Sequence, residues 1–196
     1  MILSLVLSLA LVQSQDKLSP ITCPMTGEAV GTPAGLIDFA GTRYEMCCAG
    51  CPEGFKKDPA AAIKAAKAKD KDKTYGIFLF DPISNARIDA KAAKASSDYK
   101  STRYYFATAD EKTTFDADPK KYAAKAPKKE VLYCPVAGHA IKGYAAAGGF
   151  IDIDGTRYYT CCTNCLAKLK ADNTLASKAP ADQVKAPAAI DAPAQK

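Results

Sequence analysis

Tryptophan is absent from this chain of 196 residues, histidine occurs once, and aromatic residues make up only 9% of it. A single histidine with no nucleophile motif around it argues against a Ser/His/Asp hydrolase, and no phosphate-cradling glycine loop occurs. Much of the 48% hydrophobic content is alanine, which buries little apolar area. We therefore expect a non-enzymatic protein with three small cores rather than one thick core.

The chain also lacks the basic stripe with interleaved aromatic residues that is typical of nucleic-acid binding. Its net charge is +6, but the lysines are scattered through Ala-Lys-Asp segments such as AAIKAAKAKDKDK at 61–73. This pattern is typical of a solvated helix face or a linker. We expect no nucleic-acid partner.

One hydrophobic run opens the chain, from Ile2 to Val12, and it carries no charge. As a helix it would cross only about half of a ~30 Å hydrocarbon core. We interpret residues 1–15 as a signal peptide, with no stable membrane span. No cysteine follows the run closely, so no lipobox is indicated, and we expect a secreted or periplasmic protein whose eight cysteines meet an oxidising compartment.

The sequence contains an internal repeat. GTRYEMCCAGC at 41–51 and GTRYYTCCTNC at 155–165 share their cysteine positions, and STRYYFATADE at 101–111 keeps the frame without cysteine. Aligned on Thr-Arg-Tyr, the copies stay in register through the residues that follow. We therefore predict three tandem units, called here the first repeat (20–70), the second repeat (74–127) and the third repeat (130–176).

We predict that each repeat forms a short strand with a tight turn, called here the knuckle, then a β-hairpin that turns near Gly41, Ser101 or Gly155, and then a helix. Thr108 and Glu111 form a capping-box pattern, and the Asp-Pro pairs indicate a second short helix with proline in its first turn. We expect the recurrent arginine of Thr-Arg-Tyr to lie on the hairpin surface. The Pro/Ala/Lys segment 177–196 predicts a disordered tail.

The cysteines of the first and third repeats fall where such elements would converge. Two pairs stand four residues apart at a junction of strand and helix, so one helical turn brings both thiols to one side: Cys47 with Cys51, and Cys161 with Cys165. Cys23 and Cys134 lie in Cys-Pro-x-x-Gly turns that could present a third sulfur. This ββα arrangement is typical of a small metal finger.

The repeats resemble the TRASH and YHS families of small metal-binding modules. The resemblance is carried by Cys-Pro-x-x-Gly, Tyr-x-x-Cys-x-x-x-Cys and Phe-x-x-Asp-Pro, and it covers residues 20–176. It implies an α+β, treble-clef-like fold and transition-metal binding by six cysteines: Cys23, Cys47, Cys51, Cys134, Cys161 and Cys165. The third repeat departs from it at Leu169 and Asp172-Asn173, and the second repeat has no cysteine, which indicates a structural copy.

Three thiolates leave a fourth coordination position open. Cys48 and Cys162, each beside one of the paired cysteines, are candidates for it, with packing as small hydrophobic side chains as the alternative. His139 follows Cys-Pro-Val-Ala-Gly and is a candidate nitrogen ligand in the third repeat. Glu28 stands at the matching place in the first repeat but is a poor partner for a soft ion.

Thiolate-rich sites suit Zn²⁺ or Cu⁺ and exclude Ca²⁺ and Mg²⁺ as natural guests. Four thiolates would indicate structural zinc, whereas an open three-sulfur site would suit metal capture and handover to or from another protein. The alternative is four disulfides in an extracytoplasmic interaction scaffold that binds no metal, or a change between the two states with redox conditions. Thioredoxin-type dithiols at Cys48-x-x-Cys51 and Cys162-x-x-Cys165 would require a βαβ scaffold that the sequence does not indicate.

Overall fold

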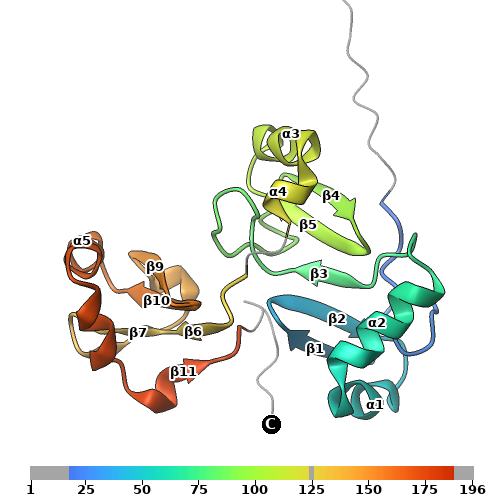
Figure 1. Cartoon of the computed structure of the whole chain (residues 1–196), viewed down its shortest axis with the longest axis horizontal. Helices are drawn as coiled ribbons and strands as arrows, with labels where there is room; N and C mark the ends of the chain where they lie inside the picture. The colour runs from blue at the N-terminus through green and yellow to red at the C-terminus, as the bar shows by residue number, and fades with distance from the viewer. Residues whose placement is uncertain (1–17, 124–125, 188–196) are drawn as a thin grey trace, which may run out of the picture.

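The computed structural model describes residues 18–123 and 126–187, and the chain folds into mixed α+β structure (Figure 1). This confirms the α+β class. The expected signal peptide at residues 1–15 lies outside the described residues. None of the helices in the described part of the chain has the length and apolar character that a membrane crossing requires.

Each Thr-Arg-Tyr motif begins the second strand of an antiparallel hairpin, as the sequence predicts. Both central residues of each two-residue turn have positive φ, the conformation of hairpin turns that match the strand twist. Glycine occupies the second turn position in two hairpins and Ser101 in the other. The strands are β1 (Gly35–Phe39) with β2 (Thr42–Met46), β4 (Ala95–Tyr99) with β5 (Thr102–Phe106), and β9 (Gly149–Ile153) with β10 (Thr156–Thr160).

The hairpins of the first and second repeats share one sheet, which the sequence does not predict. Strand β3 (Gly76–Phe78) pairs antiparallel with β2 and parallel with β5, giving the order β1-β2-β3-β5-β4 (Figure 1). A Cβ on Gly76 would lie 2.5 Å from Cγ2 of Thr42. Only glycine therefore lets β3 approach its neighbour this closely.

The third repeat has a sheet of its own with the order β11-β6-β10-β9. Strand β6 (Lys129–Val131) runs parallel to β10, as β3 does to β5. A two-stranded ladder of β7 (Tyr133–Cys134) and β8 (His139–Ala140) and a 3-10 turn, η1 (Tyr144–Ala146), lead into the hairpin.

The expected disorder from Ser177 onward is wrong as far as Pro187. Residues there form the end of η2 (Asn173–Lys178), then η3 (Ala181–Gln183) and β11 (Val184–Lys185). Strand β11 pairs antiparallel with the outer edge of β6, which would otherwise present unpaired backbone groups. Backbone pairing depends little on side chains, so Pro/Ala/Lys composition does not exclude it. Residues 188–196 lie outside the described part.

A helix follows every hairpin, and an aspartate caps the next helical segment. The first set is α1 (Cys51–Lys57), α3 (Ala109–Ala117) and α5 (Thr163–Ala171). The second set is α2 (Pro59–Lys69), α4 (Pro119–Tyr122) and η2, whose N-caps are Asp58, Asp118 and Asp172. The predicted capping box of Thr108 and Glu111 is present, and Pro59 and Pro119 stand in the first turn as expected.

Three separate hydrophobic clusters form the core of the described residues, one in each repeat, which confirms the expectation of small cores. In the second repeat the cluster is the most aromatic, with Phe115 in contact with the rings of Tyr99, Tyr104 and Phe106. In the other two repeats cysteine side chains belong to the cluster. The cysteine-free repeat therefore has a core cluster in which aromatic rings predominate and no sulfur takes part.

The prediction that the recurrent arginine lies on the surface is wrong. Arg43, Arg103 and Arg157 are all buried. Each is paired with the aspartate directly opposite on the first hairpin strand: Asp38, Asp98 or Asp152. Arg157 also stacks on Phe150, with its guanidinium carbon 3.9 Å from the ring centroid. An ion pair inside the hairpin explains why this residue recurs in all three repeats.

Candidate metal centres

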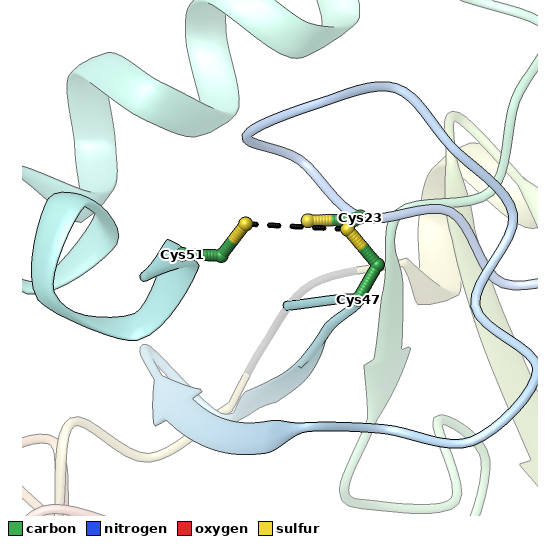
Figure 2. Close-up of side chains that lie close together, drawn as sticks. All are labelled: Cys23, Cys47 and Cys51. Atoms are coloured by element: carbon green, nitrogen blue, oxygen red, sulfur yellow. Dashed lines mark hydrogen bonds between the residues drawn. The ribbon is translucent and has the colours of Figure 1, made fainter. Parts of the chain in front are cut away.

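Cys23, Cys47 and Cys51 come from three different elements and point toward one another (Figure 2). Cys47 directly follows strand β2, and Cys51 is the first residue of helix α1. Cys23 enters from the knuckle of residues 23–27, which the Gly27 N–H closes by donating to the Cys23 carbonyl at 2.9 Å. Gly27 has a φ of 80°, which explains the glycine of Cys-Pro-x-x-Gly.

The third repeat builds the same cluster from Cys134, Cys161 and Cys165. Its knuckle is closed by the Gly138 N–H on the Cys134 carbonyl at 2.8 Å, and Gly138 also has positive φ. Cys161 directly follows β10, and Cys165 lies in the first turn of α5. The structure therefore brings together both sets of three cysteines that the sequence singles out.

The sulfur separations in both clusters fit a shared metal ion. The Sγ atoms are 4.0 Å apart for Cys47 and Cys51, 3.6 Å for Cys134 and Cys161, and 3.7 Å for Cys161 and Cys165. Two sulfurs bound at about 2.3 Å to one tetrahedral ion lie about 3.8 Å apart. A disulfide would need about 2.05 Å, and all eight cysteines are free thiols. Within each cluster the three sulfurs lie within 4.8 Å of one another.

The knuckle cysteines are surrounded by backbone N–H groups. Cys23 is fully buried, and burial opposes its thiolate. Hydrogen bonds from the backbone of Cys47, Thr26 and Met25 outweigh burial and lower the pKa of the Cys23 thiol to about 7. At Cys134 the same balance, with backbone hydrogen bonds from Cys161, Ala137 and Val136, lowers the pKa of the thiol. Both knuckles therefore stabilise a negative charge on sulfur.

The second repeat holds a carboxylate in the same place. Asp81 is fully buried and aligns with Cys23 and Cys134. Its Oδ1 accepts the N–H groups of Ile83 and Ser84, at 2.8 and 3.3 Å, and its Oδ2 accepts that of Ala107 at 2.9 Å. Two of these donors lie two and three residues after Asp81, as at each knuckle cysteine, and the third, Ala107, is the residue aligned with the third donor there. We call this group of three N–H donors the amide cradle.

The pKa of the thiol is raised, rather than lowered, at both helix cysteines and at Cys161. The neighbouring Cys48 thiol, followed by burial, raises the pKa of Cys51 to about 12. Cys162 and burial raise the pKa of Cys165 to about 12, and burial with the nearby Cys134 raises that of Cys161. Each cluster thus combines one readily ionised thiol with a thiol that holds its proton. A metal ion bound there displaces that proton, so metal affinity falls as pH falls.

None of the candidates for a fourth ligand belongs to either set of three. Cys48 is exposed, and its thiol contacts that of Cys51. Cys162 is the N-cap of α5, and its Sγ accepts the N–H of Cys165 at 3.4 Å. His139 is exposed in β8, with Nδ1 3.0 Å from the carbonyl oxygen of Ala140. Metal binding by these three residues stays a prediction.

The sequence interpretation missed the carboxylate that the amide cradle holds in the second repeat, and it missed Thr26, whose Oγ1 lies 3.2 Å from Sγ of Cys47. One feature of the sequence could have revealed the cradle. The residue aligned with Cys23 and Cys134 in the second repeat is an aspartate, which is the substitution expected where the backbone binds an anion.

The chain matches no protein-family model, no curated protein and no solved structure. Any functional conclusion therefore depends on the chemistry and geometry of the two thiol clusters.

Proposed function

We propose that the protein is an exported, non-enzymatic metal-binding protein whose first and third repeats each bind one soft transition-metal ion through three cysteine thiolates. The observation that carries the proposal is the recurrence of one sulfur geometry in two places. Both clusters have a knuckle sulfur in an amide cradle, a sulfur after the hairpin and a sulfur at the helix start. Their sulfurs are spaced as ligands of one ion.

The ligand chemistry selects Zn²⁺ or Cu⁺. Thiolate sulfur is soft, and no carboxylate or imidazole belongs to either cluster among the described residues. A planar three-sulfur arrangement with bonds of about 2.3 Å would separate the sulfurs by about 4.0 Å, so the spacing accommodates three-coordinate as well as tetrahedral binding. Because three sulfurs leave a tetrahedral position open, the sites suit capture of an ion and its handover to another protein.

The order of elements around each cluster supports the resemblance to the YHS and TRASH families. A knuckle, a hairpin and a helix start supply the three sulfurs, as in a treble-clef-like module. In this proposal the second repeat is a structural copy, because Asp81, Ala107 and Glu111 stand at the positions of the three sulfurs. Export is proposed from the apolar run at Ile2 to Val12, and it would expose the thiols to oxidants.

Metal analysis of the whole chain tests the proposal. Protein purified under reducing, metal-replete conditions should contain about two zinc or copper ions per chain, one for each cluster. The C47S/C51S variant should retain about one, since only the first repeat loses its ligands. The matched control is A107S/E111Q, which changes the equivalent positions of the second repeat and should leave the content unchanged. Metal content near zero in the wild-type protein, together with few free thiols before reduction, would favour a disulfide-stabilised scaffold instead.

A further inference from the structure

Each thiol cluster has one additional cysteine beside it that the proposed metal site does not use. Cys48 and Cys162 occupy the same position in their repeats, and neither belongs to the set of three sulfurs. Cys48 is exposed, Cys162 is half-buried, and both contact the helix cysteine of their cluster. The second repeat, which lacks the cluster, also lacks this cysteine.

The local backbone brings the additional cysteine close to its helix cysteine. The N–H of Cys51 donates to the carbonyl of Cys48 at 3.2 Å, which closes a turn across the two residues. A turn of this kind holds its end Cα atoms within about 7 Å, and disulfides need about 4.4–6.8 Å. In the third repeat, Sγ of Cys162 already accepts the N–H of Cys165.

Disulfides to the knuckle cysteines, or between adjacent cysteines, are less accessible. Cys23 and Cys134 are fully buried, so an oxidant in solution does not reach them. Cys47 and Cys48 are adjacent, as are Cys161 and Cys162, and adjacent cysteines bridge poorly because of backbone geometry. The exposed thiol of Cys48 is therefore the natural point of attack in the first repeat.

We propose that Cys48 with Cys51, and Cys162 with Cys165, are oxidisable dithiols that release the metal from their own cluster. This inference rests on the proposed metal binding. Cys51 and Cys165 each belong both to a dithiol and to a set of three ligands, so forming the disulfide removes one ligand from the ion. Two thiolates then remain, which hold a soft ion more weakly than three.

The reaction requires a disulfide oxidant of low molecular weight, such as glutathione disulfide. The Cys48 thiolate attacks one sulfur of the oxidant, its S–S bond breaks, and one thiolate leaves. The Cys51 thiolate dissociates from the ion and attacks the Cys48 sulfur of the mixed disulfide, which expels the second thiolate. Two electrons pass from the protein to the oxidant, and Cys162 with Cys165 reacts in the same way.

The test uses the full chain loaded with Zn²⁺ and treated with glutathione disulfide. Zinc release is followed with a chromogenic chelator, and the disulfides are mapped by peptide mass spectrometry. Wild-type protein should release zinc while bridges form between Cys48 and Cys51 and between Cys162 and Cys165. The C48S/C162S variant should bind zinc normally when reduced but release it at least about tenfold more slowly, because it lacks the accessible attacking thiols. The A49S/T163S variant changes neighbouring exposed positions and should behave as wild type.

Release from C48S/C162S at the wild-type rate, or bridges that map to Cys134 with Cys161, would overturn the inference. Loss of zinc from the reduced C48S/C162S variant would also overturn it, by making the additional cysteines ligands. The zinc content of reduced wild-type protein is measured first and tests the proposed function by itself. If that content is near zero, metal binding fails, and the inferred release of metal fails with it, whichever bridges form.

Discussion

At the scale of single residues, the first position of each knuckle is surrounded by donors that stabilise a negative charge. Cys23, Asp81 and Cys134 differ in chemistry, yet all three are fully buried and bonded by backbone N–H groups at aligned positions. A buried anion is stable only when donors surround it. The aspartate of the second repeat therefore indicates that the two cysteines serve as thiolates.

Replacing Asp81 with asparagine should destabilise the protein by about 1–3 kcal/mol, because an amide NH₂ would face at least one backbone N–H of the cradle. The measurement is equilibrium unfolding in urea. D154N is the matched control, since Asp154 lies in an exposed hairpin turn with positive φ, a conformation that asparagine tolerates. Equal stability of D81N and D154N would contradict the role assigned to the amide cradle.

At the scale of elements, each site position is the end of a segment rather than its middle. The knuckle, the residue after the hairpin and the first helical turn meet in all three repeats. In the second repeat the three positions are occupied by Asp81, Ala107 and Glu111. The elements therefore fix the geometry of the site, and the residue types decide whether it can hold metal.

A metal site should consequently be transferable to the second repeat. The D81C/A107C/E111C variant should raise the zinc content by about one ion per chain, because its backbone already places three side chains as in the neighbouring repeats. Metal analysis and competition with a chelator measure the gain. D81C alone is the control and should add no ion, since one thiol is a weak site. No gain from the triple variant would show that the second repeat differs in more than its side chains.

The sequence alone was sufficient for the hairpins, for the helices that follow them and for the close approach of the six cysteine sulfurs. Hairpin turns, the capping box of Thr108 and the Asp-Pro helix starts depend on local conformation, which nearby residues determine. The sharing of β3 and the pairing of β11 could not be predicted, because they join strands that lie far apart in the sequence. The burial of the hairpin arginines was missed because the aspartate opposite each one was not considered as a partner.

At the scale of the whole molecule, a buried polar network joins the second and third repeats. Arg87 of the second repeat forms an ion pair with Glu130 in β6, and its guanidinium carbon lies 4.2 Å from the ring centroid of Tyr144. Glu130 also accepts the hydroxyl groups of Tyr144 and Tyr159, at 3.0 and 2.7 Å. Because both charged side chains are almost fully buried, each depends on the other for its compensating charge across the contact between the repeats.

The E130A variant should lose about 3–5 kcal/mol of stability, because Arg87 would remain buried without its partner. The R87M/E130L variant should recover much of this loss by filling the same space with apolar side chains. Equilibrium unfolding measures both. D116A, which breaks the partly exposed pair with Lys112 and the exposed hydrogen bond from Ser97, is the control and should change stability by at most about 1 kcal/mol. A loss from E130A no larger than that of D116A would contradict this role of the network.

Strand β3 lies between the hairpins of the first two repeats and belongs to both. No cut in the chain can therefore give each of them a complete sheet. A fragment that stops before Gly76 leaves β2 as a bare edge, and a fragment that starts after Phe78 does the same to β5. Bare edges invite pairing with other molecules. The repeats are thus related in sequence but not interchangeable in structure, because the thiol-free repeat supplies the strand that completes the sheet of its neighbour.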